Sequence, residues 1–216
     1  MALPGKAFPG GAVFMKRLQT KDFVLTGVGL MKVSWAQLYN DIAGCEKCRL
    51  CETRTNVVPG EGDPHARLMF IGEGPGQEED RQGRPFVGRS GELLTRMLHA
   101  IGLERSEVYI CNIVKCRPPQ NRIPEPDEAA ACLGYLRAQV ALVRPRVVVL
   151  LGKVACQYTI RDQVFITRDH GRWYEQKGVW FMPTYHPSYL LRDPAKKREA
   201  WEDFQKVRNK LNELAL

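Results

Sequence analysis

The chain has 216 residues, of which 44% are hydrophobic and 26% charged. This length allows one domain with a substantial core, and the hydrophobic fraction excludes wholesale disorder. Its net charge of +8 is compatible with a polyanionic partner such as nucleic acid, and equally with an ordinary basic protein. A membrane-spanning helix needs about 18 consecutive uncharged apolar residues, and this sequence has no such stretch, so we expect no membrane partner.

The first 30 residues differ from the rest of the chain. Their short apolar run lacks the continuous core and the small-residue cleavage site of a secretory signal. From Met31 onward the sequence resembles an ordinary N-terminus, so we expect residues 1–30 to be a poorly ordered extension from an upstream start and residues 31–216 to be a single domain. An odd number of cysteines, seven, argues against a disulfide scaffold and for the cytoplasm.

Helical patterns and apolar runs alternate along the chain from residue 35 onward. Apolar spacing predicts helices at residues 35–43, 93–103, 127–142 and 196–214, with Ser90 and Asp127 as N-terminal caps. Apolar runs predict strands at residues 66–72, 108–114, 146–152 and 179–185, the last as the second arm of a hairpin that begins near residue 172. Strands alternating with helices predict an α/β fold, with a parallel sheet covered on both faces.

Glycine-rich and polar segments follow the predicted strands. Gly72 to Gly76 follow the first strand, Asn112 lies near the end of the second, and His186 follows the fourth. Ligands of open α/β sheets bind beyond the carboxyl ends of the strands, so we expect these residues to converge on one site. The motif GEGPG matches neither the P-loop nor the dinucleotide fingerprint, and by itself it indicates only a tight turn.

Four cysteines form two pairs that are distant in the sequence. Cys45 and Cys48 have CxxC spacing after the first predicted helix, and Cys116 and Cys132 flank a Pro-rich loop. If the pairs converge, they make a site with four thiolate ligands, which suits zinc or an iron–sulfur cluster, and spacing does not separate the two. Cys51 extends the first pair to CxxCxxC and competes for a ligand position.

Three long motifs carry a family resemblance: GEGPGQEEDRQGRPFVGRSGELL (72–94), NIVKCRPPQNRIPEPDEAAAC (112–132) and HPSYLLR (186–192). Together with the cysteine spacing, they resemble the family 4 uracil-DNA glycosylases, which carry a [4Fe–4S] cluster. The resemblance runs from about Cys45 to about Arg192. It implies a three-layer α/β/α fold with a central four-stranded parallel sheet. It also implies a structural cluster and a set of ligands: Cys45, Cys48, Cys116 and Cys132.

The same resemblance implies a repair enzyme that flips uracil out of DNA and hydrolyses its glycosidic bond, leaving an abasic site. Phe86 stacks on the flipped ring. Asn112 donates its amide NH2 to uracil O4 and accepts from N3–H, a pattern that cytosine reverses. His186 donates to uracil O2 and stabilises the negative charge that develops as the bond breaks. Gly72, Gly74, Gly76 and Ser188 complete the expected base site.

The residue that positions the attacking water is an open question in this sequence. The best-known members of the superfamily have an aspartate in a GQDP motif, and the corresponding position here is Gly74. Either Glu73 or Glu79 orients the water, or a dissociative route needs little help from a nucleophile. We favour Glu73 as the catalytic carboxylate and expect Glu79 near the uracil edge, where it guards against the thymine methyl.

Several residues are expected to contact the DNA outside the base pocket. Leu190 is the expected wedge that fills the vacated stack, with Leu191 as the less favoured choice. Arg192 is expected to contact a phosphate, and Lys115 and Arg117 to face phosphates near the cluster. We expect a monomer that acts on uracil in single- or double-stranded DNA, in the cytoplasm and associated with the nucleoid.

Specific residues argue against the alternative interpretations of this sequence. The loop RQGRPFVGRSG has no inserted basic segment with a histidine, which argues against the relatives that trap their product covalently. GEGP with Glu73 departs from the GLAP motif of a relative with broader base specificity. A non-catalytic nucleic-acid-binding or redox module would be expected to lack the pocket residues, whereas Phe86, Asn112 and His186 are all present. If only the metal site is considered, the alternative is a zinc-ribbon binding module. The basic C-terminal helix has interleaved acids, so we interpret it as a solvated face.

Overall fold

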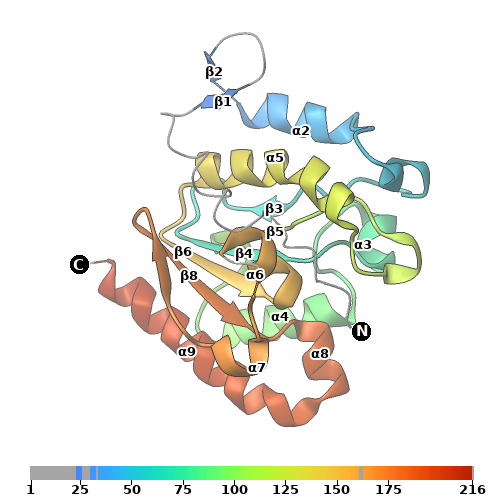
Figure 1. Cartoon of the computed structure of the whole chain (residues 1–216). Helices are drawn as coiled ribbons and strands as arrows, with labels where there is room; N and C mark the ends of the chain where they lie inside the picture. Colours follow the sequence, from blue (N-terminus) through green and yellow to red (C-terminus); the bar gives the residue numbers. More distant parts are fainter. Residues whose placement is uncertain (1–22, 26–29, 33, 161–162, 216) are drawn as a thin grey trace, which may run out of the picture.

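The computed structural model describes residues 23–25, 30–32, 34–160 and 163–215 (Figure 1). Residues 1–22 lie outside this part, and with them most of the expected N-terminal extension. Within the remainder, β1 (Phe23–Leu25) pairs antiparallel with β2 (Leu30–Lys32) in a separate two-stranded sheet. The expectation of a poorly ordered segment 1–30 and a domain 31–216 stays a prediction.

The main sheet has six strands in the order β3-β5-β4-β6-β8-β7. The bounds are β3 (Glu61–Gly62), β4 (Leu68–Gly72), β5 (Tyr109–Asn112), β6 (Val147–Leu151), β7 (Tyr174–Gln176) and β8 (Val179–Thr184). The four middle strands are parallel, as predicted, and β3 and β7 add one antiparallel strand at each edge. The prediction of four strands is therefore correct for the parallel core and misses edge strand β3, whose two residues carry no strand pattern.

The sheet lies between two layers of helices, which confirms the three-layer α/β/α architecture (Figure 1). On one face are α2 (Trp35–Ala43), α5 (Pro126–Val143) and α6 (Lys153–Thr159); on the other are α4 (Arg89–Ala100) and α9 (Lys197–Glu213). Alternate residues of the parallel strands supply the two cores: Ile71 packs with the first layer and Phe70 with the second. Both faces of these strands are thus buried, which explains why they read as continuous apolar runs.

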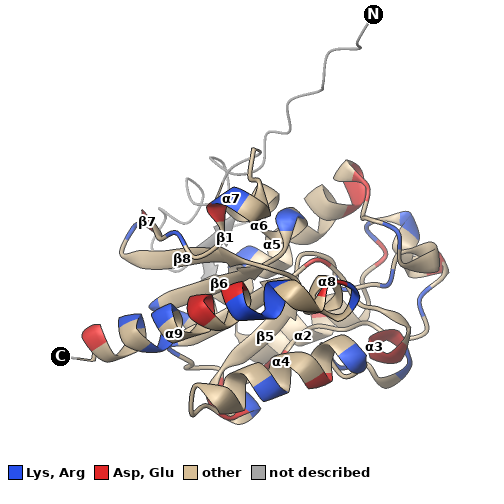
Figure 2. Cartoon of the chain, turned by 90° about the horizontal axis from the view of Figure 1, so that it is seen from below, with Lys and Arg blue, Asp and Glu red and all other residues tan. Residues whose placement is uncertain are grey.

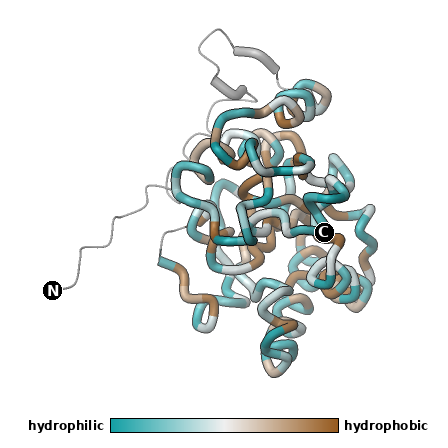
Figure 3. The backbone as a smooth tube through the Cα atoms, turned by 90° about the vertical axis from the view of Figure 1, so that its right-hand side faces the viewer, coloured by the Kyte–Doolittle hydropathy of each residue, from teal (hydrophilic) through white to brown (hydrophobic). Residues whose placement is uncertain are grey.

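Helices α2, α4 and α9 are amphipathic, and Figure 3 shows hydrophobic and hydrophilic stretches alternating along the chain. Helix α9 buries Phe204 and Val207 and exposes interleaved acidic and basic residues, as expected for a solvated face (Figure 2). Both predicted caps are wrong by two residues. Helix α4 begins at Arg89 after Gly88, one residue before Ser90, and α5 begins at Pro126 with Glu125 as the cap, so Asp127 lies inside the first turn.

Short helical segments complete the chain: α3 (Gln77–Gln82), α7 (Ile166–Asp169), α8 (Pro187–Arg192) and the 3-10 turns η2 (Arg49–Glu52), η3 (Arg105–Glu107), η4 (Pro119–Asn121) and η5 (Pro194–Lys196). Helix α3 follows β4 and helix α8 follows β8, so both lie at the carboxyl end of the parallel strands. Within the described residues no helix is long and apolar enough to span a membrane.

Candidate active site and thiol cavity

The ends of β4 and β5 bring Gly72 and Asn112 side by side, because these two residues are register partners in neighbouring parallel strands. A Cβ atom on Gly72 would overlap Asn112 Oδ1 and lie 2.6 Å from Cζ of Phe86. Only glycine leaves space here for both side chains. The structure thus brings together Gly72 and Asn112, two of the residues expected to converge, and adds Phe86 to them.

Phe86 is buried and holds a left-handed backbone conformation, with φ of 52°. Such a conformation is unfavourable for an aromatic residue and persists only where its surroundings impose it. Arg105 donates to the carbonyl oxygens of Phe86 (3.1 Å) and Pro85 (2.9 Å), and a Cβ on Gly91 would overlap the Phe86 carbonyl. The ring of Phe86 lies 5.7 Å from the ring of His186, centre to centre, and so extends from the β4 end toward β8.

The carboxylate of Glu79 organises the loop around Phe86. Its Oε1 accepts N–H bonds from Val87 (2.9 Å) and Gly88 (3.0 Å), and its Oε2 accepts from Gly76 (3.1 Å). A Cβ on Gly76 would lie 2.7 Å from Oε2, which explains the glycine. Both oxygens thus bind the backbone of this loop, and the expected role of Glu79 as a guard against the thymine methyl stays a prediction.

The side-chain oxygen of Asn112 is an unsatisfied acceptor. Asn112 is 1% exposed, and within the described part of the chain its Oδ1 has no hydrogen-bond partner. A buried acceptor without a partner costs about 1–3 kcal/mol, so folded proteins rarely keep one without a use. An N–H donor on a ligand beside Phe86 would satisfy this oxygen.

His186 is held as a neutral imidazole with a defined tautomer. Its Nδ1 accepts the backbone N–H of Ser188 at 3.1 Å and lies 2.8 Å from Ser188 Oγ, at the start of α8. Burial, together with the smaller effect of the Arg192 charge, lowers the pKa of His186 to about 4. Because Nδ1 is an acceptor, the single proton resides on Nε2, which becomes the donor available to a ligand.

Glu73 follows β4 directly and is half-buried. Burial raises the pKa of its carboxyl group above the ordinary value. Its backbone oxygen accepts the N–H of Val114 at 3.2 Å, and a Cβ on Gly74 would lie 2.7 Å from Val114 Cγ2. The segment after β4 therefore packs tightly on the segment after β5, which fixes the position of Glu73.

Helix α8 corrects the expected wedge. Leu190 is 1% exposed and packs with Leu93, Tyr185 and Ala200, so its side chain belongs to the core and cannot enter a base stack. Leu191 is half-buried and Arg192 is exposed on the same helix. The sequence HPSYLLR alone does not show which leucine faces inward, because a helix of six residues carries too short a pattern.

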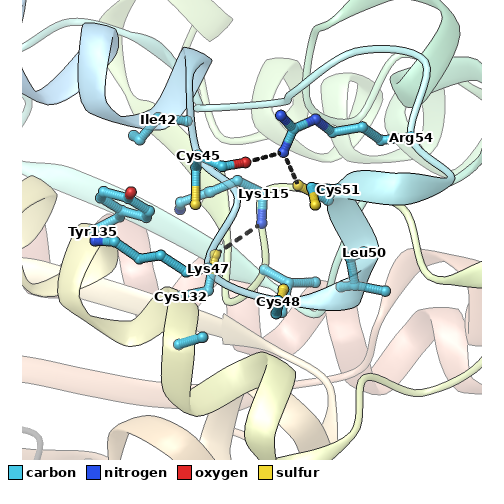
Figure 4. Close-up of a pocket in the computed structure, with 13 residues that line it drawn as sticks. Ile42, Cys45, Lys47, Cys48, Leu50, Cys51, Arg54, Lys115, Cys132 and Tyr135 are labelled. Atoms are coloured by element: carbon cyan, nitrogen blue, oxygen red, sulfur yellow. Dashed lines mark hydrogen bonds between the residues drawn. The ribbon is translucent and has the colours of Figure 1, made fainter.

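All four predicted cysteine ligands line one cavity, together with Cys51 (Figure 4). Burial raises the pKa of Cys132 to about 11, and burial also raises the pKa values of Cys48 and Cys116. As they stand, the described residues include no group of three or more His, Cys, Asp or Glu side chains that could hold a metal ion. The donor set, five sulfurs around one apolar cavity, nevertheless has the chemistry of an iron–sulfur site.

Three arginines missed by the sequence analysis hold the segments around this cavity in place. Arg54 donates to the carbonyl oxygen of Cys45 (2.7 Å) and to Cys116 Sγ (3.2 Å), so it links the two cysteine pairs. Arg49 and Arg122 both bind the buried carboxylate of Glu128 on α5, and the hydrogen bond from Arg122 leads the effects that lower the pKa of Glu128 to about 2. Nothing in the local sequence pattern marks these long-range partners.

Lys115 corrects a second expectation. It is 1% exposed, and its Nζ donates to the Asn112 carbonyl oxygen and to Gln139 Oε1, each at 2.6 Å. Lys115 therefore supports the strand end that carries Asn112 and does not face a phosphate. Arg117 is half-buried and donates to Asn121 Oδ1 at 2.8 Å.

The family model of the uracil DNA glycosylase superfamily matches residues 59–205, about two-thirds of the chain and the whole base site. The type-4 uracil-DNA glycosylase of Sulfurisphaera tokodaii is 45% identical over 184 residues, which are 81% of this chain and 84% of that protein. The type-4 uracil-DNA glycosylase of Thermotoga maritima is 48% identical over 171 residues, 76% of this chain and 88% of that protein. The chain belongs to the type-4 uracil-DNA glycosylases.

Similarity to the type-5 uracil-DNA glycosylases is lower, which agrees with the placement in the type-4 family. The type-5 protein of Thermus thermophilus is 37% identical over 152 residues, 61% of this chain and 68% of that protein. The three long motifs that predicted family 4 all lie within the region that the superfamily model matches. The family assignment made from these motifs is confirmed.

Proposed function

We propose that the chain flips uracil out of DNA and hydrolyses the bond between the base and deoxyribose, as a DNA repair enzyme. The observation that carries this proposal is the buried, unpartnered Oδ1 of Asn112 beside the Phe86 ring. Uracil N3–H is a donor of the kind that this oxygen lacks, and Phe86 offers a face for the flipped ring. Cytosine has no hydrogen at N3, so it would leave the acceptor unsatisfied at a cost of about 1–3 kcal/mol.

His186 is proposed to act as a neutral hydrogen-bond donor to uracil O2. Its Nδ1 is occupied by the Ser188 N–H, which directs the Nε2 proton toward the pocket. Negative charge gathers on the uracil oxygens as the glycosidic bond breaks. A fixed donor to such an oxygen stabilises a transition state by about 3–4 kcal/mol, and the low pKa keeps His186 from becoming charged at neutral pH.

Glu73 is proposed to orient the attacking water. Its position directly after β4 and its raised pKa are those of a carboxyl group that is partly removed from solvent. A pKa closer to the working pH suits a group that receives a proton from water. Gly72, Gly74 and Gly76 act by leaving space around this segment, and Glu79 acts by holding the loop of Phe86 in place.

We further propose that the thiol cavity binds a [4Fe–4S] cluster through Cys45, Cys48, Cys116 and Cys132. Two half-buried thiols of the N-terminal segment and two buried ones near α5 border the same space. A cluster bound there would supply a cross-link between these segments. Cleavage of a glycosidic bond needs no electron transfer, so the proposed role is structural.

DNA contacts outside the pocket are proposed on helix α8, which begins one residue after His186. The exposed Arg192 is proposed to bind a phosphate, and the half-buried Leu191 to enter the stack that the base vacates. The protein is proposed to act as a monomer on single- or double-stranded DNA, in the cytoplasm and associated with the nucleoid.

The test uses anaerobically purified protein and a fluorescent oligonucleotide with one uracil, followed by alkali to reveal abasic sites. Matched oligonucleotides carry cytosine, thymine or hypoxanthine at the same position. We expect cleavage of the uracil strand by the wild type and none by Asn112→Ala. Folded, cluster-loaded wild-type protein that cleaves no strand would overturn the proposal.

A further inference from the structure

The thiol cavity contains one sulfur more than a [4Fe–4S] cluster has iron corners. Cys45, Cys48, Cys116 and Cys132 account for four ligands, and Cys51 lines the same cavity as a half-buried thiol (Figure 4). Within the described residues no hydrogen bond engages the Cys51 side chain. The structure thus gives Cys51 no packing or bonding role that competes with ligation.

The backbone places Cys51 next to Cys48. Turn η2 begins directly after Cys48, and the Cys51 N–H donates to the Cys48 carbonyl oxygen at 3.1 Å. Cys48 is the residue that caps this turn and Cys51 lies within it, so the backbone hydrogen bond holds the two residues one turn apart. Their sulfurs are also near enough for the charge of one to act on the other.

The surroundings of Cys51 suit an anionic sulfur. Arg54, which binds Cys116 Sγ, lies within electrostatic range of Cys51 and Cys45 as well. A cluster with four thiolates carries net negative charge, and a guanidinium against it offsets part of that charge. This compensation stays in place whether Cys48 or Cys51 supplies the fourth thiolate.

We propose that Cys51 is a reserve ligand of the iron–sulfur cluster, which takes the position of Cys48 when the bond between iron and Cys48 is lost. The proposal rests on the cluster proposed above. In the exchange one iron–sulfur bond forms to Cys51 and one to Cys48 breaks, while the Cys51 proton passes to the departing Cys48 thiolate. No electron is transferred, and the number of iron–sulfur bonds is unchanged.

The experiment measures iron per chain and the visible absorption of anaerobically purified Cys48→Ala, Cys51→Ala and the double variant. Alanine is chosen because serine can itself bind iron through oxygen. We expect Cys51→Ala to match the wild type and Cys48→Ala to retain iron to within about twofold of it. The double variant should lose the cluster.

Cys132→Ala is the matched control, because Cys132 lies on α5, in a different wall of the cavity, and should have no reserve. The inference would be overturned if Cys48→Ala contained as little iron as the double variant and Cys132→Ala while the wild type contained its cluster. An iron-free wild type would instead overturn the proposed cluster. If Cys48→Ala is insoluble, the wild type and Cys51→Ala are compared during iron removal by a chelator: we expect faster loss from Cys51→Ala, and equal rates would refute the reserve ligand.

Discussion

Replacing Asn112 by alanine should abolish uracil excision without destabilising the protein. In the wild type, burial of the unpartnered Oδ1 costs about 1–3 kcal/mol of folding free energy. The substitution removes this cost together with a polar amide that buries little apolar surface. We expect a net gain of about 1 kcal/mol in unfolding free energy, or about 3 °C in Tm for a chain of this size.

The same substitution removes both hydrogen bonds proposed to hold the uracil ring. If they contribute together about 3 kcal/mol in the transition state, kcat/KM should fall at least about 100-fold. Single-turnover excision of a uracil oligonucleotide measures this loss, and thermal unfolding followed by far-UV circular dichroism measures stability. Both are run anaerobically on samples with equal iron content.

Asn56→Ala is the matched control, because this asparagine is satisfied. Its Nδ2 donates to the carbonyl oxygens of Asp80 (2.8 Å) and Arg81 (3.1 Å). We expect Asn56→Ala to lower Tm and to leave excision unchanged, the opposite of Asn112→Ala. A fall in Tm for Asn112→Ala that equals or exceeds that of Asn56→Ala would refute the reasoning, since Oδ1 would then have a structural partner.

Three further predictions follow from the geometry. Gly72→Ala should abolish excision and keep the far-UV spectrum, because the new Cβ would displace both the base reader and the stacking ring. Burial raises the pKa of Glu73 and lowers that of His186 to about 4, so the kcat of the wild type should fall as pH falls through the Glu73 pKa. The Glu73→Gln variant should be slow, and its kcat should not change with pH down to about pH 5. Leu190→Ala should cost about 2–5 kcal/mol of stability, and Leu191→Ala should instead weaken excision from duplex DNA at unchanged Tm.

Each of these has a result that contradicts it. Gly134→Ala on α5 is the control for Gly72→Ala, since a Cβ there meets nothing within 4 Å; equal activity of the two variants would place the base elsewhere. If the kcat of Glu73→Gln still falls at low pH as that of the wild type does, a group other than Glu73 causes the fall. Similar Tm values for the two leucine variants would contradict the burial of Leu190.

The layered fold and the ends of its strands were predictable because they depend on local patterns. Apolar runs located β4, β5, β6 and β8, and the residues after them supplied Gly72, Asn112 and His186. Parallel strands place such residues at one edge of the sheet whatever the strand order. The motif resemblance then assigned roles that spacing alone left open.

Contacts between distant segments escaped prediction. Lys115 has the composition of a phosphate-binding cation, yet Gln139, 24 residues away, draws it into the core. The loop after α3 folds back so that the N–H groups of Val87 and Gly88 bind the Glu79 carboxylate, a contact that the motif did not predict. Arg54 reaches Cys116 across 62 residues of sequence. Such partners depend on tertiary structure, and no local periodicity encodes them.

The thiol cavity also has a consequence for the order in which the chain folds. With the proposed cluster bound, a cross-link from Cys48 to Cys116 closes a loop of 68 residues (116 − 48) that contains Gly72, Phe86 and Asn112. By loop-closure entropy, such a link restricts the unfolded chain by about 4 kcal/mol. During synthesis this link cannot close until Cys116 has emerged, and by then Gly72, Phe86 and Asn112 have all been made, whereas His186 lies outside the loop and is made later.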